Sequence, residues 1–299
     1  MIYYLCDRKH QFTVTTYLNT WGKEIAPFFE PLPYNIFLRR KKHQSGTYIF
    51  SDLERLTRLQ HKHAANIACQ LSSIPSRYTV VNQPDRYLNR LEMLRALHRR
   101  GINVFNVYRP WELAAIKKFP VFVRAARIHT GPLTELLNTR WAVILALLRP
   151  RVIRRSEGNM LIAEYVDVSD EDGLFHKYAA YRIADRMVAA HVERNHNWSV
   201  KLQDSHDGID VDRLVSDNLD YIKHNPHARQ LMAIFELAGI EYGRIDYAVD
   251  SRGLIIFEIN TNPHIILDKE EGGPRWREQV DSVCQSLNDA FYKLNRSDE

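Results

Sequence analysis

The stretch YGRIDYAVDSRGLIIFEINTNP, residues 242–263, places two carboxylates and an amide within two apolar runs. The runs are separated by DSRG, a sequence typical of a tight turn, so we expect a β-hairpin. Side chains alternate across a strand, so Glu258 and Asn260 point to one face, and Asp246 comes level with them if the turn pairs the strands. Each residue alone is most simply a solvated hairpin position. The spacing of the whole set instead predicts a site for a hard cation such as Mg²⁺.

Arg244 lies two residues before Asp246 and is therefore expected on the same face of the hairpin. A guanidinium beside such a site can hold a developing oxyanion or a phosphoryl oxygen without losing its charge. The neighbours Phe257 and Ile259 are expected on the opposite face, where they can pack into the core.

Length and composition narrow the class of protein. At 299 residues the chain is long enough for two or three lobes, since single cores stop growing near that size. The net charge of +5 favours anionic ligands such as nucleotides, phosphorylated metabolites or acidic peptides. Three distant cysteines without a CxxC pair predict no disulfide framework and no cysteine zinc site. We expect a cytoplasmic protein, because no secretory signal is evident and the longest apolar run, WAVILALL, is too short to span a bilayer.

The order of apolar patterns predicts three lobes. Residues 46–71 are typical of a strand, an Asp or Ser helix cap and a helix, and residues 77–84 of another strand, which together favour an α/β lobe with a parallel sheet. LTELLNTRWAVILALL predicts a helix over 133–148, and a later helix should end at Gly239. The expected fold class is α/β (α+β), with an N-terminal lobe at 1–84, a central lobe at 85–165 and a C-terminal lobe at 166–299.

The hairpin resembles the metal-binding hairpin of the ATP-grasp superfamily, which includes D-alanine–D-alanine ligase, glutathione synthetase and enzymes that add glutamate to a ribosomal protein. The resemblance implies an N-terminal α/β lobe followed by two α+β lobes that clasp ATP. It also implies two Mg²⁺ ions, with Mn²⁺ as an alternative, at the ATP phosphates. Asp246 would bind one ion, Glu258 would bridge both, and Asn260 would bind the other. Arg244 would be the catalytic residue that steadies the tetrahedral intermediate.

The similarity extends backwards over roughly residues 82–266. LNRLEMLRALHRRGINV is similar to a family helix that opens with an Asp-Lys pair, and here Asn89 and Arg90 occupy that pair. FPVFVRAARIHTG resembles the strand and glycine-rich loop that bind phosphate, with Arg124 in place of the family's lysine. Arginine keeps the charge and binds phosphate well, but with a planar fork rather than a point donor. The loop has Gly131 alone, where several glycines would let backbone N–H groups approach phosphates.

LIAEYVDV resembles the hinge that holds adenine. The resemblance assigns Glu164 to the exocyclic amine, Tyr165 and Val166 to backbone contacts, and an acidic residue of the 170–172 loop, taken as Asp172, to the ribose. Lys201 and Phe257 are assigned to the nucleotide site as well. Four further basic residues could bind phosphate or an acidic substrate, although each alone is more simply solvated: Lys177, Arg182, Arg186 and Arg194.

The expected function is an ATP-dependent carboxylate–amine ligase that forms an amide or peptide bond through an acylphosphate. Its partners would be small-molecule or peptide carboxylates and amines, without membrane or nucleic acid, and relatives suggest a homodimer. Three rivals stay open: a kinase on the same fold, a non-catalytic nucleotide-binding module, and a nucleic-acid binder using the basic run RRKKH at 39–43.

Overall fold

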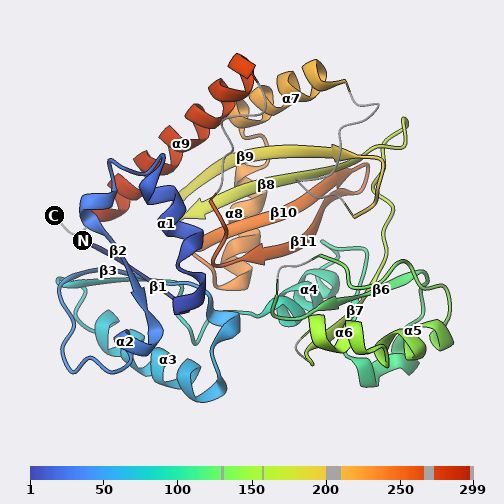
Figure 1. Cartoon of the computed structure of the whole chain (residues 1–299), viewed down its shortest axis with the longest axis horizontal. Helices are drawn as coiled ribbons and strands as arrows, with labels where there is room; N and C mark the ends of the chain where they lie inside the picture. The colour runs from blue at the N-terminus through green and yellow to red at the C-terminus, as the bar shows by residue number, and fades with distance from the viewer. Residues whose placement is uncertain (129–130, 157, 200–209, 266–272, 297–299) are drawn as a thin grey trace.

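The structure is a computed structural model that describes residues 1–128, 131–156, 158–199, 210–265 and 273–296. The described residues form three β-sheets, with strand orders β2-β1-β3-β4, β5-β7-β6 and β11-β10-β8-β9. In Figure 1 the first two sheets lie side by side below the third, larger one. Among the described helices, none combines the length and the apolar character needed to cross a bilayer.

The N-terminal lobe has the expected parallel sheet. Its central strand β1 pairs with β2 and β3, and β4 lies outside β3. The helix cap is not the expected Asp or Ser: Thr57 caps α3 and forms a reciprocal capping box with Gln60, because residues 53–55 first make a short 3₁₀ turn. The elements are β1 (Ile2–Cys6), α1 (Phe12–Asn19), β2 (Phe29–Pro33), α2 (Tyr34–Phe37), β3 (Gly46–Phe50), α3 (Arg58–Ser72) and β4 (Tyr78–Val81).

The central lobe is a small antiparallel sheet. The helix predicted over 133–148 begins only at Arg140, after the N-cap Thr139. The preceding residues run beside β6 instead, since the Leu133 and Leu137 amides donate to backbone oxygens of that strand, and Leu133 is buried in the lobe's core. The elements are β5 (Val107–Tyr108), β6 (Val121–Ala125), α5 (Arg140–Leu147), α6 (Pro150–Arg155) and β7 (Met160–Glu164).

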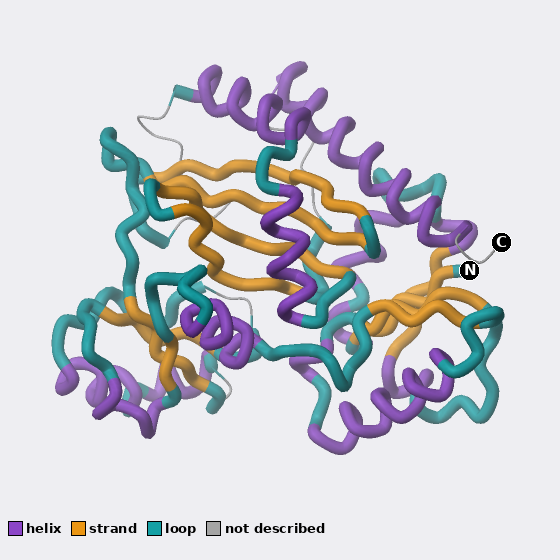
Figure 2. Tube along the Cα trace, turned by 180° about the vertical axis from the view of Figure 1, so that it is seen from behind, coloured by secondary structure: helices purple, strands orange, loops and turns teal. Residues whose placement is uncertain are grey.

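The large sheet is fully antiparallel, and helices cover both faces. As expected, α8 ends before Gly239, which adopts a φ of +65° and leaves no room for a Cβ, because that atom would lie 2.2 Å from the Arg86 carbonyl oxygen. Figure 2 shows α8 crossing one face of the sheet. The elements are α4 (Arg90–Arg99), β8 (Phe175–Ile183), β9 (Arg186–Asn195), α7 (Val211–His224), α8 (Ala228–Ala238), β10 (Tyr242–Asp250), β11 (Gly253–Asn260) and α9 (Gly273–Arg296).

The N-terminal lobe is joined to the large sheet by one continuous core and by a buried asparagine. Residues of β1, β8 and α9 belong to the same hydrophobic cluster. Asn82, fully buried with a φ of +63°, donates to the Phe50 and Tyr242 carbonyl oxygens at 3.1 and 2.8 Å. Its Oδ1 accepts from the amides of Glu241 and Tyr242 at 2.6 and 2.8 Å. The side chain therefore links the end of the parallel sheet to the first residues of β10.

Candidate active site

The hairpin pairs as the sequence predicts. Asp246 lies opposite Glu258, and Arg244 lies opposite Asn260, so all four side chains occupy one face of the β10–β11 pair. Asp246 and Asn260 are buried, at 6% and 9% exposure. A bulge follows Asp246, where the register shifts before Tyr247.

Glu258 is held by two arginines from different elements. Arg90 Nη2 donates to Glu258 Oε2 at 2.6 Å, and Arg124 Nη2 donates to the same oxygen. Arg90 is the first residue of α4, and its Nη1 also donates to the Ala125 carbonyl oxygen at 2.7 Å. Burial, reinforced by the positive charge of Arg90 and opposed by Glu258, lowers the pKa of Arg124 to about 10. Two cations thus crowd one carboxylate.

Arg244 and Asp246 form a separate pair. Arg244 Nε and Nη2 donate to the two Asp246 carboxylate oxygens at 2.9 and 3.3 Å, a two-pronged contact. Burial acts to lower the pKa of Arg244, but the adjacent Asp246 carboxylate outweighs it and raises that pKa above its ordinary value. Asn260 Oδ1 accepts from the Asn262 amide at 2.9 Å, which fixes the amide group at the end of β11.

The same sheet face carries a cluster of Lys177, already a candidate from the sequence, with His191 and Glu193, which the sequence did not assign. Lys177 Nζ lies 2.6 Å from Glu193 Oε2, and His191 Nε2 lies 3.1 Å from Glu193 Oε1. Burial acts to raise the pKa of Glu193, but His191 and Lys177 together lower it to about 2. The pairing Lys177↔Glu193 depends on the two-residue turn at 184–185 and on a register shift between Ala179 and Ala180, and the turn alone would set Val192 opposite Lys177.

A cavity of about 160 Å³ lies between the central lobe and the large sheet. Both Phe257 and Glu258 border it, although they are neighbours on β11, the edge strand of the large sheet. Ligand pockets usually measure about 300–1,000 Å³. A nucleotide would therefore need the arginines or the aromatic side chains to move. The predicted residues that border the cavity are Arg124, Glu164, Tyr165, Val166, Lys177, Asp246, Phe257 and Glu258.

At residues 164–166, which resemble an adenine-binding hinge, two of the groups assigned to adenine already have hydrogen-bond partners within the protein. Glu164 is buried, with Oε1 accepting from the Tyr108 hydroxyl at 2.8 Å and Oε2 from the Asn106 amide at 2.9 Å. The Tyr165 amide already donates to the Pro120 carbonyl oxygen at 3.0 Å. Trp198, which sequence reasoning missed, packs against Phe122 and Tyr165 with ring centroids 5.0 and 5.8 Å apart. The rings of Phe122, Tyr165 and Trp198 form an aromatic wall of the cavity. They are half-buried, whereas Glu164 is buried.

The remaining predicted residues lie apart from the cavity. Asp172 is exposed in a tight turn, where its amide donates to Asp170 Oδ1 at 3.0 Å, and it does not border the cavity. Lys201 lies outside the described residues. Arg244 and Asn260 sit further along the sheet face, and Arg90 reaches the site through Glu258. The roles of all these residues stay predictions.

The donor set fits a hard cation in its chemistry. Among the described residues no group of three His, Cys, Asp or Glu is arranged to hold a metal. The predicted ligands are instead two carboxylates that face each other and one amide oxygen at the strand end. Oxygen donors of this kind suit Mg²⁺, which keeps several waters and shares phosphates with its substrate.

An α/β lobe with a parallel sheet is thus followed by two lobes with antiparallel sheets, and a cavity lies between the second and third. The strand that resembles an adenine-binding hinge and the acidic hairpin border that cavity from opposite sides. This order of lobes, with a cavity between the second and third, is the arrangement that the resemblance to the ATP-grasp superfamily implies.

No protein-family model and no curated protein matches the chain. Solved structures of ATP-grasp ligases align with it over nearly the whole length. D-alanine–D-alanine ligase from Bacillus anthracis shares 10% identity over 98% of this chain and 99% of its own, with a TM-score of 0.48. An ATP-grasp RimK domain protein from Sphaerobacter thermophilus shares 14% over 97% and 98%, with a TM-score of 0.49. The ATP-grasp ligase PsnB, complexed with minimal precursor, Mg and ADP, shares 12% over 99% and 98%, also at 0.49. Likenesses this distant carry no argument about activity.

Proposed function

We propose that this protein is an ATP-dependent carboxylate–amine ligase of the ADP-forming type. The observation that supports it is the convergence on Glu258, which lies opposite Asp246, of Arg90 from α4 and Arg124 from β6. Two cations and two carboxylates beside an aromatic-walled cavity suit a triphosphate bound with a divalent cation.

In this proposal the arginines exchange one anion for another. Arg90 and Arg124 leave Glu258 and bind phosphate oxygens of ATP, while the base stacks against the aromatic wall. The vacated carboxylate of Glu258, together with Asp246 and Asn260, would hold Mg²⁺. The chemistry that Mg²⁺ supplies when bound is neutralisation of the phosphate charge.

The reaction then proceeds in two balanced steps. A substrate carboxylate oxygen attacks the γ-phosphorus, and the bond to the β-phosphate oxygen breaks to release ADP and leave an acylphosphate. An amine next attacks the acyl carbon, and phosphate departs. Arg244 keeps its charge and holds the oxyanion of the tetrahedral intermediate. The work of the protein is positioning and charge neutralisation.

We extend the proposal to the acceptor and the setting. The basic surface favours an acidic amino acid or peptide as the carboxylate substrate, since the net charge is +5. A cytoplasmic location agrees with three cysteines that form no disulfide within the described residues. A homodimer is the proposed oligomeric state.

The test is ADP release with Mg²⁺-ATP across a panel of amino acids and acidic dipeptides, with hydroxylamine present as a trap. An acyl-hydroxamate formed together with ADP supports the ligase. A stable phosphorylated product with no hydroxamate supports the kinase instead. Nucleotide binding without any ADP, across the whole panel, supports a non-catalytic module and overturns the ligase.

A further inference from the structure

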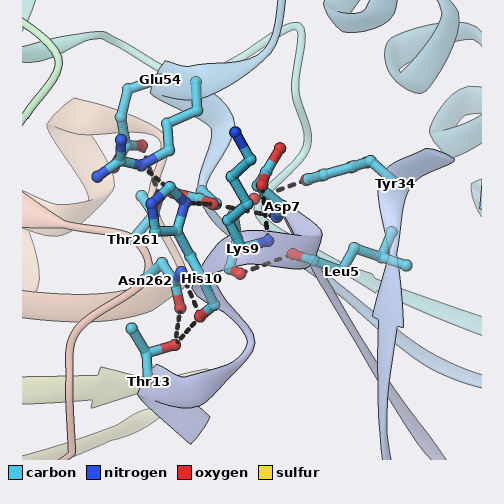
Figure 3. A network of polar contacts seen from close by, with 12 residues as sticks. Leu5, Asp7, Lys9, His10, Thr13, Tyr34, Glu54, Thr261 and Asn262 are labelled. Atoms are coloured by element: carbon cyan, nitrogen blue, oxygen red, sulfur yellow. Dashed lines mark hydrogen bonds and ion pairs between the residues drawn. The ribbon is translucent and has the colours of Figure 1, made fainter.

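A polar network lies at the carboxyl ends of the first lobe's parallel strands. The chain leaves β1 towards β2 on one side and returns to β3 on the other, so the loops after β1 and β3 flank a topological switch point. In open α/β sheets, ligands bind in the crevice at that point. Figure 3 shows that the two loops meet there, with the end of the hairpin, Thr261 and Asn262, beside them.

Asp52 is the anchor of this network. It is 1% exposed and adopts a left-handed φ of +55°, a conformation that is uncommon outside glycine but that Asp enters more readily than most residues. Its Oδ2 accepts from the Asp7 amide at 3.1 Å and lies 3.2 Å from His10 Nδ1. Its Oδ1 accepts from Arg55 Nε at 2.9 Å. This buried carboxylate thus fixes the His10 ring between two loops.

The network also fixes His10 against the proposed metal-binding hairpin. The Thr13 hydroxyl contacts both the His10 carbonyl oxygen, at 2.7 Å, and Asn262 Oδ1, at 2.6 Å. Thr261 donates to Glu54 Oε2 at 2.9 Å. Asn262 follows the predicted ligand Asn260 by two residues. The His10 loop is therefore tied to the end of β11, the strand that carries two of the proposed Mg²⁺ ligands.

One ring nitrogen of His10 remains for a ligand. The side chain is 26% exposed, and Nε2 makes no hydrogen bond within the part of the chain that the structure describes. When Asp52 holds the proton of Nδ1, Nε2 carries the lone pair and can accept a proton.

We propose that His10 is the base for the amine-accepting step, and that Asp52 is its positioning residue. The inference rests on the proposed ligase function. The incoming primary amine arrives as an ammonium and gives one proton to His10 Nε2. The lone pair of the deprotonated amine nitrogen then forms the C–N bond with the acylphosphate carbon. The C–O bond to phosphate breaks, and its electron pair leaves with phosphate. The second N–H proton passes to the released phosphate or to water.

Two small nucleophiles of similar size distinguish this role from a structural one. At pH 7 ammonium is almost wholly protonated and needs a base, whereas hydroxylamine is mostly uncharged and does not. The experiment supplies Mg²⁺-ATP, the carboxylate of the panel that gives the highest rate, and either ammonium chloride or hydroxylamine. It compares wild type with His10→Gln, Asp52→Asn and the control His63→Gln, a histidine exposed on α3 of the same lobe.

His10→Gln should lower carboxamide formation from ammonium by about 100-fold, the usual contribution of a positioned base. Hydroxamate formation should stay within about twofold, which also shows that the variant is folded. Asp52→Asn should lower kcat with ammonium more than it raises KM, and His63→Gln should match wild type.

Three results overturn the role of His10. They are retained carboxamide formation in His10→Gln, an equal loss with both nucleophiles, and a wild type that makes hydroxamate but no carboxamide. A wild type that makes neither product with any carboxylate refutes the ligase function itself, and this proposal with it.

Discussion

Glu258 and Asp246 face each other directly across the β10–β11 hairpin, yet each is neutralised by different arginines. Like charges opposite one another on a sheet are destabilising, and here Arg90 and Arg124 offset one carboxylate while Arg244 offsets the other. The ion pairs therefore stabilise the same arrangement of carboxylates that the proposed cation would use.

Glu258→Gln should lower the free energy of unfolding by about 3 kcal/mol, because it leaves two buried guanidinium groups without their shared carboxylate. Urea unfolding measures it. Pyrophosphate should recover most of the loss, since it offers both arginines a new anion. Lys293→Ala, which breaks an exposed pair with Asp185, is the control and should cost under about 1 kcal/mol. Equal losses in the two variants would contradict the paired role of the arginines.

Asp246→Asn and Glu258→Gln should each lower Mg²⁺-dependent ADP formation by at least about 100-fold, because each replaces a negatively charged proposed metal ligand with a neutral amide. Circular dichroism should show that both variants stay folded. The metal-site assignment fails if both variants keep wild-type turnover at saturating Mg²⁺.

Arg244→Ala should reduce turnover far more than nucleotide affinity, since its proposed contact forms only as charge develops in the intermediate. We expect kcat to fall by about 100-fold or more, while ATP affinity from calorimetry changes by less than about threefold. A variant whose loss lies mainly in ATP affinity would place Arg244 on the phosphates instead.

Glu193 should contribute a measurable pH dependence to stability. Its folded pKa of about 2 lies below the ordinary value of 4.5, despite burial, because of His191 and Lys177. The unfolded chain therefore binds the proton first. The stabilisation is complete above pH 4.5 and is lost as the pH falls towards 2. Unfolding free energies measured across that window should fall less steeply in Glu193→Gln, and Lys177→Met should give an intermediate slope. Parallel curves for wild type and Glu193→Gln would disprove the prediction.

Trp198 should report nucleotide binding. Its ring packs on Phe122 and Tyr165 at the cavity wall, so a bound base must displace or stack on this cluster. Mg²⁺-ATP should change the tryptophan emission of the wild type, and Trp198→Phe should lose that change. Trp141→Phe, which removes an exposed ring on α5, should retain it.

The sequence predicts those parts of the site that depend on local alternation. Glu258 and Asn260 share a face because they lie two apart on one strand, and the same holds for Arg244 and Asp246. The bulge after Asp246 brings the two pairs to one face, because the register of the turn alone would set Asp246 opposite Phe257. The sequence did not predict the cluster of Glu193 and His191, because their partner Lys177 lies on another strand and no local pattern reveals the register between the two strands. The extended path of residues 133–137 was missed for a similar reason: its leucines suit a helix equally well, and only the neighbouring strand β6 decides.

The bonds of Asn82 have a consequence for how a nucleotide could enter. That side chain fastens the β3–β4 end of the first lobe to β10, and a shared apolar core continues the attachment through α9. The first lobe and the large sheet should accordingly move as a single rigid body. A nucleotide would then enter when the central lobe, which carries Arg124, moves away from the large sheet after the Arg124–Glu258 ion pair breaks.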